Sequence, residues 1–535
     1  MLRHRFIILL GIFTLTSLLV MLLQLTTRTV DGEALPTQFS NVENVRSGEV
    51  NTIERNAATS STLSCREGLA GWEPYLSQGI DIQQLGGGIY LDFNAHAPWP
   101  QPDAMEFIQV IRMRQNKTIS GTYLPGYTTA FSLTDEAGGL GPIIAGAPGS
   151  LWLVGNEPDR GPDYPNGPSQ DDIYPQEYAR AYHDIYYFIK AHDPSAQVAV
   201  GGLVEITPGR IQYLEIVWDT YAALYGKAMP ADVWNMHIYI LPEIVGVANV
   251  ALGTDPALAY THVWTHTMGE PNGYTYGDHD NLIIFDSQVR RMRQWMKEHG
   301  QQDKPLLLSE FGLLYGEGVT DEFGNTFTVS RAATFLTKTF SYLATTTDAS
   351  LGMPSDGNRL VQQWVWFSVN NPLGYISNLV NNTTPMTFTL VGDRFRTSVA
   401  TRPLLSNLQP RTTFSSIPIL GAGESSTTAT LSVEMINNGN QLVSVPFMVT
   451  FYANAALTEI INSTVITGGV PGCARRRVVA SAAWPELGVG PHDFWVKVDS
   501  GSTVGESNEA DNVMAGQAFI GTQRIYLSLI DRNFP

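Results

Sequence analysis

The sequence predicts an α/β domain with a parallel sheet, followed by an all-β sandwich and preceded by an apolar N-terminal segment. Three observations lead to this prediction. Residues 6–25 form a run without a single charge. From residue 79 to about residue 402, short apolar runs alternate with helical patterns, which is typical of parallel sheets. From about residue 405, Ser, Thr, Val and Gly dominate and strand-length runs are separated by turn clusters, as in a sandwich.

The apolar run at residues 6–25 is long enough to span a bilayer. Arg3 and Arg5 precede it and acidic residues follow it, so we expect the N-terminus inside and the bulk of the chain outside. We favour an uncleaved signal anchor over a cleaved signal peptide for residues 1–27, because no clear cleavage site follows. Either alternative exports the rest of the chain. Residues 28–64 are polar and lack periodicity, which predicts a flexible linker.

The α/β part, residues 65–404, contains seven visible strand candidates. They lie at residues 89–94, 107–112, 151–155, 198–204, 233–239, 305–309 and 360–368. Helical patterns cover residues 175–192, 282–299 and 331–345. A doubly wound sheet and a closed eight-stranded barrel both fit this alternation, and we expect a missing strand within residues 121–133.

The sandwich is placed at residues 405–520, with a short apolar and aromatic tail at residues 521–535. Strand-length runs lie at residues 428–436, 443–452, 476–482 and 493–498. Their spacing and turn clusters are typical of an immunoglobulin-like module.

Composition excludes some partners and favours others. The formal net charge of −18 argues against a nucleic acid partner, which needs basic patches, and against anionic lipid. The aromatic content of 10% is common in carbohydrate-handling proteins. Cys65 and Cys473 are the only cysteines; we expect two unrelated thiols, although an oxidising compartment would allow them to pair. No Cys/His spacing indicates a metal site, so we expect neither a metal nor a cofactor.

Two glutamates follow buried strands in matching settings. Glu157 ends the stretch LWLVGNEP, in which Pro158 stops the strand. Glu310 ends the stretch KPLLLSE, which Gly312 closes after one more residue. The carboxyl ends of parallel strands share one face, where ligands bind. Two carboxyl groups on that face meet the main requirement for glycosidic cleavage, which needs one acid and one nucleophile or base.

With both glutamates in place, the chain resembles the retaining glycoside hydrolases of clan A. These are TIM-barrel enzymes in which Asn-Glu-Pro closes strand 4 and a glutamate closes strand 7. LVGNEPD and LLLSEFG match these two motifs, WNMHIY resembles the strand-6 segment, and VQQWVWF resembles the Trp-bearing strand 8. The resemblance covers about 320 residues and is specific for the clan rather than for one family. It implies a (β/α)8 barrel and a β-linked polysaccharide or oligosaccharide as substrate.

The resemblance also implies roles for individual residues. Glu157 would be the general acid/base, Glu310 the nucleophile, and Asn156 a hydrogen-bond partner of the sugar's 2-hydroxyl. Retention requires the two carboxyl groups about 5–5.5 Å apart. We expect a raised pKa for Glu157, because it must be protonated in the first step.

Further pocket candidates have ordinary structural explanations that stay open. His237 or Tyr239 is a candidate donor to the nucleophile, and Arg112 resembles an arginine that many clan members place beside it. The remaining candidates are two tryptophans as a sugar platform and two residues past the first strand: Trp364, Trp366, Asn94 and His96. The long loop at residues 241–281 should shape specificity. It contains several histidines, which lack a fixed ligand spacing.

Near the C-terminus, VDSGSTVGESNEADNV at residues 498–513 resembles the closing hairpin of adhesion-related modules of bacterial surface proteins. We expect this module to act as a spacer or an attachment unit, and its acidic residues to stay solvated rather than to bind calcium. The leading hypothesis is therefore an exported, membrane-tethered retaining glycosidase. The alternatives are a non-catalytic glycan-binding protein on the same barrel and an adhesion or scaffold protein whose sandwich carries the function.

Overall fold

The computed structural model describes residues 64–71, 81–97, 105–162, 170–245, 249–262, 273–381, 385–474 and 477–522. The predicted signal anchor, nearly all of the linker and most of the C-terminal tail lie outside these residues. Among the described helices, none combines the length and the apolar character needed to cross a membrane.

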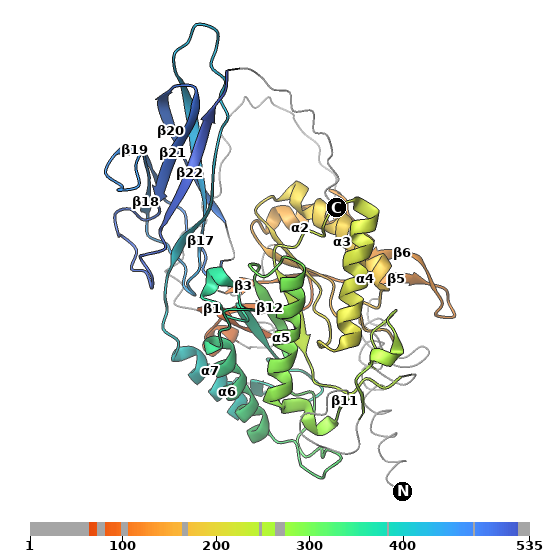
Figure 1. The fold of residues 1–535 in the computed structure, drawn as a ribbon. Coiled ribbons are helices and arrows are strands. Elements are labelled where there is room, and N and C mark those ends of the chain that lie inside the picture. The colour runs from red at the N-terminus through yellow and green to blue at the C-terminus, as the bar shows by residue number, and fades with distance from the viewer. Residues whose placement is uncertain are drawn as a thin grey trace, which may run out of the picture.

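Parallel strands form the centre of the α/β part (Figure 1). They are β1 (Ser64–Ala70), β2 (Gly87–Leu91), β3 (Glu106–Phe107), β4 (Gln109–Ile111), β7 (Leu151–Val154), β8 (Gln197–Val200), β9 (Trp234–Ile238), β12 (Leu306–Phe311) and β13 (Gln363–Phe367). One sheet has the order β3-β2-β1-β13-β12-β9 and the other β4-β7-β8. A parallel bridge between Ala199 and Val233 joins β8 to the segment entering β9, and β3 continues directly into β4. The backbone pairing therefore passes through all of these strands in turn.

Helices follow the strands along the chain and lie around them (Figure 1). They are α2 (Leu140–Gly146), α3 (Pro175–His192), α4 (Pro208–Tyr225), α5 (Leu282–Glu298), α6 (Val329–Thr345) and α7 (Leu390–Ala400). Short 3-10 turns are η2 (Ile82–Leu85), η3 (Pro256–Leu258), η4 (Tyr276–Asp280) and η5 (Pro354–Asp356). Local sequence sets the helix ends: Pro175 occupies the first turn of α3, and the side chain of Asn281 accepts from Ile283 N–H at the start of α5.

Alternate strand residues belong to two different cores. One cluster contains the helices and strand residues such as Trp152, Trp234 and Trp366. The other contains strand and loop residues without a helix, such as Leu153, Val233 and Phe367. This two-residue alternation is what strands buried on both faces require. The side of the second cluster is the side on which the functional residues lie.

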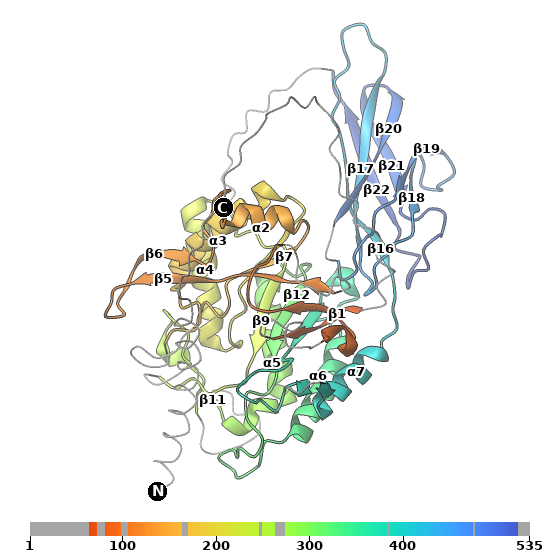
Figure 2. The ribbon, with the colours of Figure 1, turned by 180° about the vertical axis from the view of Figure 1, so that it is seen from behind.

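The predicted eighth strand was placed wrongly. Residues 121–133 instead form part of an antiparallel hairpin, β5 (Met113–Lys117) with β6 (Tyr123–Thr129), which projects away from the sandwich (Figure 2). The missing parallel strand is β1, which pairs with β2 and β13. Its charged residues hid it, because Arg66 and Glu67 are buried in ion pairs with Asp356 and Arg402. Small two-stranded pairs complete this part: β10 (Thr261–His262) with β11 (Gly273–Tyr274), and β14 (Val380–Asn381) with β15 (Thr387–Phe388).

The C-terminal part is a sandwich of two antiparallel sheets, as predicted. Its strands are β16 (Leu408–Ser415), β17 (Thr427–Asn437), β18 (Phe447–Tyr452), β19 (Ile460–Ile466), β20 (Val478–Leu487), β21 (Gly490–Lys497) and β22 (Val513–Ile520). The sheet orders are β16-β17-β20 and β19-β18-β21-β22, with one apolar core of residues from both sheets.

The sandwich is attached to the α/β part at the end where the parallel strands begin. Cys65, in β1, forms a disulfide with Cys473 of the sandwich, so the expectation of two unrelated thiols was wrong. The guanidinium of Arg66 donates to the carbonyl oxygen of Asn438 at 3.1 Å. Arg411 pairs with Asp303, just before β12. The carboxyl ends of the parallel strands therefore point away from the sandwich.

Candidate active site

The two predicted glutamates lie at the carboxyl ends of parallel strands. Glu157 follows β7 and is 4% exposed, and Glu310 lies near the end of β12 and is 5% exposed. Glu157 has a φ of 47°, a left-handed conformation that costs about 1–3 kcal/mol in a residue with a side chain. Its N–H donates to the carbonyl oxygen of Gly202 at 2.9 Å, which helps to hold it. Strained backbone of this kind is concentrated at functional sites.

His237 lies between the two glutamates. Its Nδ1 is 3.4 Å from Oε1 of Glu157, and its Nε2 is 3.5 Å from Oε1 of Glu310. The strand register explains this position, because Glu310 of β12 is paired with His237 of β9. One side-chain oxygen or nitrogen from each of the three residues lies within 4.8 Å of the others. Two carboxylates and an imidazole could hold a metal ion at this spacing, and the expectation of no metal stays a prediction.

Tyr239 donates its hydroxyl to Oε2 of Glu310 at 2.9 Å. Two aromatic rings lie against Tyr239: Phe367 is edge-on with 6.3 Å between centroids, and His279 is stacked at 6.4 Å. Phe93 lies in turn against Phe367 at 6.1 Å. Nδ1 of His279 contacts the carbonyl oxygen of Ile240 at 3.0 Å, and its Nε2 accepts from Leu314 N–H. Burial lowers the pKa of His279 to about 4, so this ring is a neutral wall of the site.

The pKa shifts correct one expectation. Burial opposes ionisation of Glu157, but the His237 hydrogen bond and the charge of Arg160 together lower the pKa of Glu157. Burial raises the pKa of Glu310 to about 7, with a contribution from the Glu157 charge and against the effects of His237 and Tyr239. Burial lowers the pKa of His237, but the two glutamates raise it by more than burial lowers it, so the net shift of this pKa is upward. Of the two glutamates, Glu310 therefore keeps its proton to the higher pH, and the predicted rise in the pKa of Glu157 was wrong.

Asp171 organises the predicted residues Asn156 and Arg112, and sequence reasoning missed it. Its Oδ2 accepts from the N–H of Asn156 at 2.7 Å and from Met113 N–H at 3.2 Å. Its Oδ1 is paired with the guanidinium of Arg112. Arg112 also donates to Gln170 at 3.0 Å. Arg112 is thus held beside the site, and its charge lowers the pKa of Glu310.

The predicted sugar platform needs correction. Trp364 and Trp366 are both 0% exposed and belong to the cluster packed with the helices. Trp366 lies against Phe311 and Phe340, and its indole N–H donates to Ser377. The two indoles do share one face of β13, as predicted, but it is the helix-facing one. Phe367, one residue further, takes the opposite face and reaches the site.

Asn94 and His96, predicted as pocket residues, follow β2 and form a local network with Asp92. Nε2 of His96 lies 2.9 Å from Asp92, and its N–H donates to Gln109 at 2.7 Å. Asn94 is exposed, and its side chain donates to the carbonyl oxygen of Asp92 at 3.2 Å. Their role as pocket residues stays a prediction.

A second buried network lies behind Glu157. Arg210, at the start of α4, is 0% exposed and pairs with Asp159 and with Glu243 at 3.1 Å. Glu205 is also 0% exposed, and burial and the Glu243 charge raise its pKa. The network ties the loop that follows β9 to the segment that carries Glu157. Of this network, the sequence pointed only to Asp159, which directly follows the Asn-Glu-Pro motif.

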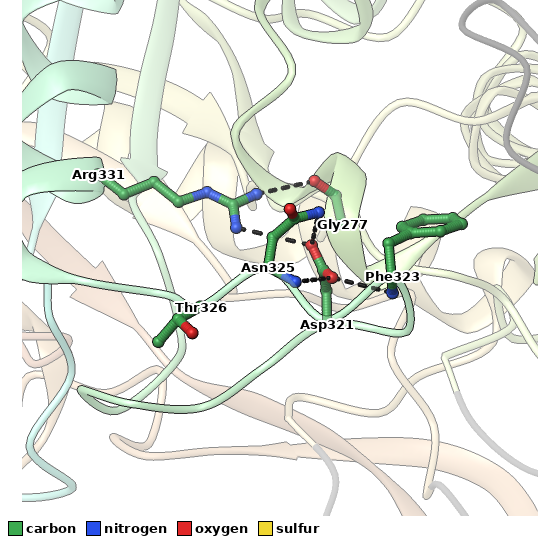
Figure 3. Close-up of a pocket in the computed structure, with 6 residues that line it drawn as sticks. All are labelled: Gly277, Asp321, Phe323, Asn325, Thr326 and Arg331. Carbon is green, nitrogen blue, oxygen red and sulfur yellow. Dashed lines mark hydrogen bonds and ion pairs between the residues drawn. The ribbon is translucent and has the colours of Figure 1, made fainter.

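A cavity of about 490 Å³ lies on the loops that follow β9 and β12 (Figure 3). Its lining includes Asp321, Phe323, Asn325 and Arg331. Both oxygens of Asp321 accept hydrogen bonds within its own turn, from Phe323 N–H and from the backbone and side chain of Asn325. Glu157 and Glu310 do not line this cavity. The hydrogen bonds that Asp321 accepts within its own turn stabilise that turn.

Residues 410–516 match the CARDB family model. The match covers the sandwich and includes residues 498–513, on which the resemblance to adhesion-related modules rests. No curated protein is significantly similar to the chain. The CARDB domain of a Pyrococcus furiosus protein, solved in complex with di-metal ions, is 20% identical, with 23% of this chain and all of that chain covered and a TM-score of 0.18.

Two solved structures are similar over more of the chain. A glucosidase from Croceicoccus marinus is 11% identical, with 80% of this chain and 94% of that chain covered and a TM-score of 0.38. A putative beta-galactosidase from Bacteroides fragilis is 10% identical, with 86% of this chain and 55% of that chain covered and a TM-score of 0.34.

Proposed function

We propose that this chain is a retaining glycoside hydrolase that cleaves O-glycosidic bonds in a β-linked polysaccharide or oligosaccharide. Residues 65–404 would form its (β/α)8 catalytic barrel. The observation that carries the proposal is the pair of buried glutamates, Glu157 and Glu310, with an oxygen of each within 4.8 Å. This short oxygen-to-oxygen distance supports double displacement, for which the carboxyl groups lie about 5–5.5 Å apart, over inversion, for which they lie about 6.5–9.5 Å apart.

In the first step, the carboxylate of Glu310 attacks the anomeric carbon while Glu157 protonates the departing oxygen. This breaks the glycosidic bond and forms a glycosyl ester on Glu310. In the second step, Glu157 takes a proton from water, the water oxygen attacks the same carbon, and Glu310 is released. Each step inverts the anomeric centre, so the product keeps the configuration of the substrate.

The proton needed on Glu157 is available from His237. Nδ1 of His237 lies 3.4 Å from Oε1 of Glu157, and the two glutamate charges favour its protonated form. A sugar bound against Glu157 would exclude water from its carboxylate, which favours the neutral acid. Before the first step, Glu310 releases its proton to solvent, which requires a pH near or above its pKa of about 7, and His237 passes its proton to Glu157. Glu157 is then the acid and Glu310 the ionised nucleophile.

Neighbouring groups would hold the substrate and prepare the nucleophile. Tyr239 fixes the orientation of Glu310 and favours its charged form. Asn156 lies beside Glu157, with its backbone fixed by Asp171, and would bind the sugar's 2-hydroxyl. Phe367 and Phe93 offer apolar faces on the same side, which suits sugar rings.

Export is part of the proposal. The Cys65–Cys473 disulfide suits an oxidising compartment, and the uncharged run at residues 6–25 suits a signal anchor or signal peptide. The CARDB module would serve as a spacer or as a contact to a cell surface or glycan.

The experiment is release of reducing ends from a panel of β-glucans, mannans and xylans. Wild type should cleave at least one, and Glu157→Gln and Glu310→Gln should each lose about 10³-fold or more in kcat. Glu215→Gln, on the outer surface of α4, is the matched control and should stay active. Binding of a glycan without cleavage would refute the enzyme and favour a glycan-binding protein.

Two further measurements test the mechanism. Proton NMR of the first product should show retained anomeric configuration, and inversion would exclude double displacement. Glu157→Ala, given azide and a substrate with a good leaving group, should yield a glycosyl azide of retained configuration, because azide needs no general base. If Glu310→Ala gave this product instead, Glu310 would be the acid/base and Glu157 the nucleophile.

A further inference from the structure

The connection between β21 and β22 concentrates negative charge. It carries Asp499, Glu506, Glu509 and Asp511 within residues 498–512, a segment called here the acidic turn. These carboxylates accept hydrogen bonds from backbone N–H groups and side-chain amides, and none forms an ion pair among the described residues. Burial raises the pKa of Glu506 to about 7, and the charges of Glu509 and Asp499 add to this effect.

Asn512 is the last residue of the acidic turn, directly before β22. Its side chain is 0% exposed, and its Nδ2 donates to Oε1 of Glu506 at 2.9 Å and to Oε2 of Glu509 at 3.3 Å. Its Oδ1 has no hydrogen-bond partner among the described residues. The amide thus places the positive end of a dipole between two carboxylates and leaves its oxygen unsatisfied, which is costly for a buried polar atom.

Two more buried oxygens beside it share this property. Asp511 accepts through Oδ2 from Asn407 at 3.1 Å and from Gln409 at 3.3 Å. Oδ1 of Asp511 and Oε1 of Gln409 have no partner within the described part of the chain. The acidic turn therefore combines uncompensated charge with unpartnered oxygens of both carboxylate and amide type.

We propose that the acidic turn binds a calcium ion through Glu506, Glu509 and Oδ1 of Asn512, with Asp511 beside it. A rotation of the Asn512 amide would place Oδ1 instead of Nδ2 between the two carboxylates. The bound ion would then balance the negative charges of Glu506 and Glu509. Oxygen-only ligands on a turn, without a thiolate or imidazole, suit calcium, which accepts six to eight oxygens in flexible geometry. Magnesium demands a stricter octahedron and is disfavoured.

The ion would also stabilise the segment that connects the α/β part to the sandwich. Glu506 accepts from the N–H of Leu408, and a bridge pairs it with Ser406. Ser406 lies just before β16, and Leu408 is the first residue of that strand. Calcium bound to Glu506 would therefore tie this segment to the acidic turn.

Calorimetric titration of the full chain, freed of metal with EDTA and dialysed, tests the proposal. Calcium chloride should bind at one site with a Kd of about 10⁻⁴–10⁻³ M, the range of extracellular modules. Magnesium chloride should bind at least about tenfold more weakly. Saturating calcium should raise the thermal midpoint of the sandwich transition by several degrees. Glu506→Gln should lose calcium binding about tenfold or more, yet melt at a higher temperature than wild type in EDTA, because it removes repulsion.

Glu509→Gln covers the case in which Glu506→Gln does not fold, because Glu509 is exposed and should lose only the calcium response. Glu459→Gln, an exposed acid elsewhere in the sandwich, should bind as wild type does. Glu310→Gln should also bind normally, which separates this site from the proposed catalytic cluster. Absence of binding at about 10 mM calcium, equal binding by Glu509→Gln, or binding lost in Glu310→Gln would each overturn the proposal.

Discussion

Replacing Tyr239 by phenylalanine removes the hydroxyl that donates to Oε2 of Glu310 at 2.9 Å. A hydrogen bond to a charged group contributes about 1.5–3 kcal/mol, and this one stabilises only the ionised form of Glu310. One pKa unit corresponds to about 1.4 kcal/mol, so the change should raise the pKa of Glu310 by about one to two units. Starting from a pKa of about 7, the variant should ionise at roughly 8 to 9.

The assay is kcat/KM against pH on an aryl β-glycoside of the sugar that the glycan panel identifies. The nucleophile must be ionised to attack, so activity rises with pH through the pKa of Glu310 in the free enzyme. In Tyr239→Phe this acidic limb should move upward by one to two units. Tyr315→Phe is the control, because its hydroxyl has no partner among the described residues although its ring lies edge-on to His279, with the centroids 4.8 Å apart. An unchanged acidic limb in Tyr239→Phe, with activity lost at every pH alike, would refute the assignment of Tyr239 as the group that tunes Glu310.

Three other outcomes follow from the same geometry. Glu310→Gln should be more stable than wild type by about 3 kcal/mol at pH 8 and equally stable near pH 4.5, because native Glu310 ionises at about 7 and an unfolded glutamate near 4.5. Denaturant unfolding at both pH values measures this difference, and a gain in stability that does not grow with pH would contradict it. Gly202→Ala would place a Cβ 2.4 Å from Nε2 of His237, so the ring must move and kcat should fall about tenfold or more, whereas unchanged kinetics would mean that His237 is not held by this contact. Replacing both Cys65 and Cys473 by serine opens a loop of 408 residues, which should cost up to about 6 kcal/mol by chain entropy; an unfolding midpoint equal to that of wild type would show that the sandwich docks without the bond.

Elements with clear local signals could be predicted from the sequence. Helix α3 begins and ends at the predicted residues, because Pro175 suits the first turn and Asp193-Pro194 prevents its extension. Helix α4 was missed, because apolar and aromatic residues occur all around it and leave no stripe. Strand β1 was missed for the opposite reason, since its charged residues are compensated by partners far along the chain.

The candidate site divides in the same way. Glu157 and Glu310 could be found because each follows a buried apolar strand, which is a local pattern. The position of His237 between them depends on the register of β9 against β12, and the pKa directions depend on that position in turn. The face that Trp364 takes, and with it the opposite face that Phe367 takes, depends on which side of β13 the helices cover. None of these is a property of one segment.

The attachment of the sandwich where the parallel strands begin has a consequence for how the protein would meet its substrate. Cys65 and Arg66 fix the module at the back of the strands, whereas Glu157 and Glu310 lie at their front. If the module holds a support and the α/β part is the proposed glycosidase, the support would lie on the side opposite Glu157 and Glu310. Under the proposed function, this arrangement would favour polymer that reaches the site from the surrounding medium over polymer in the support itself.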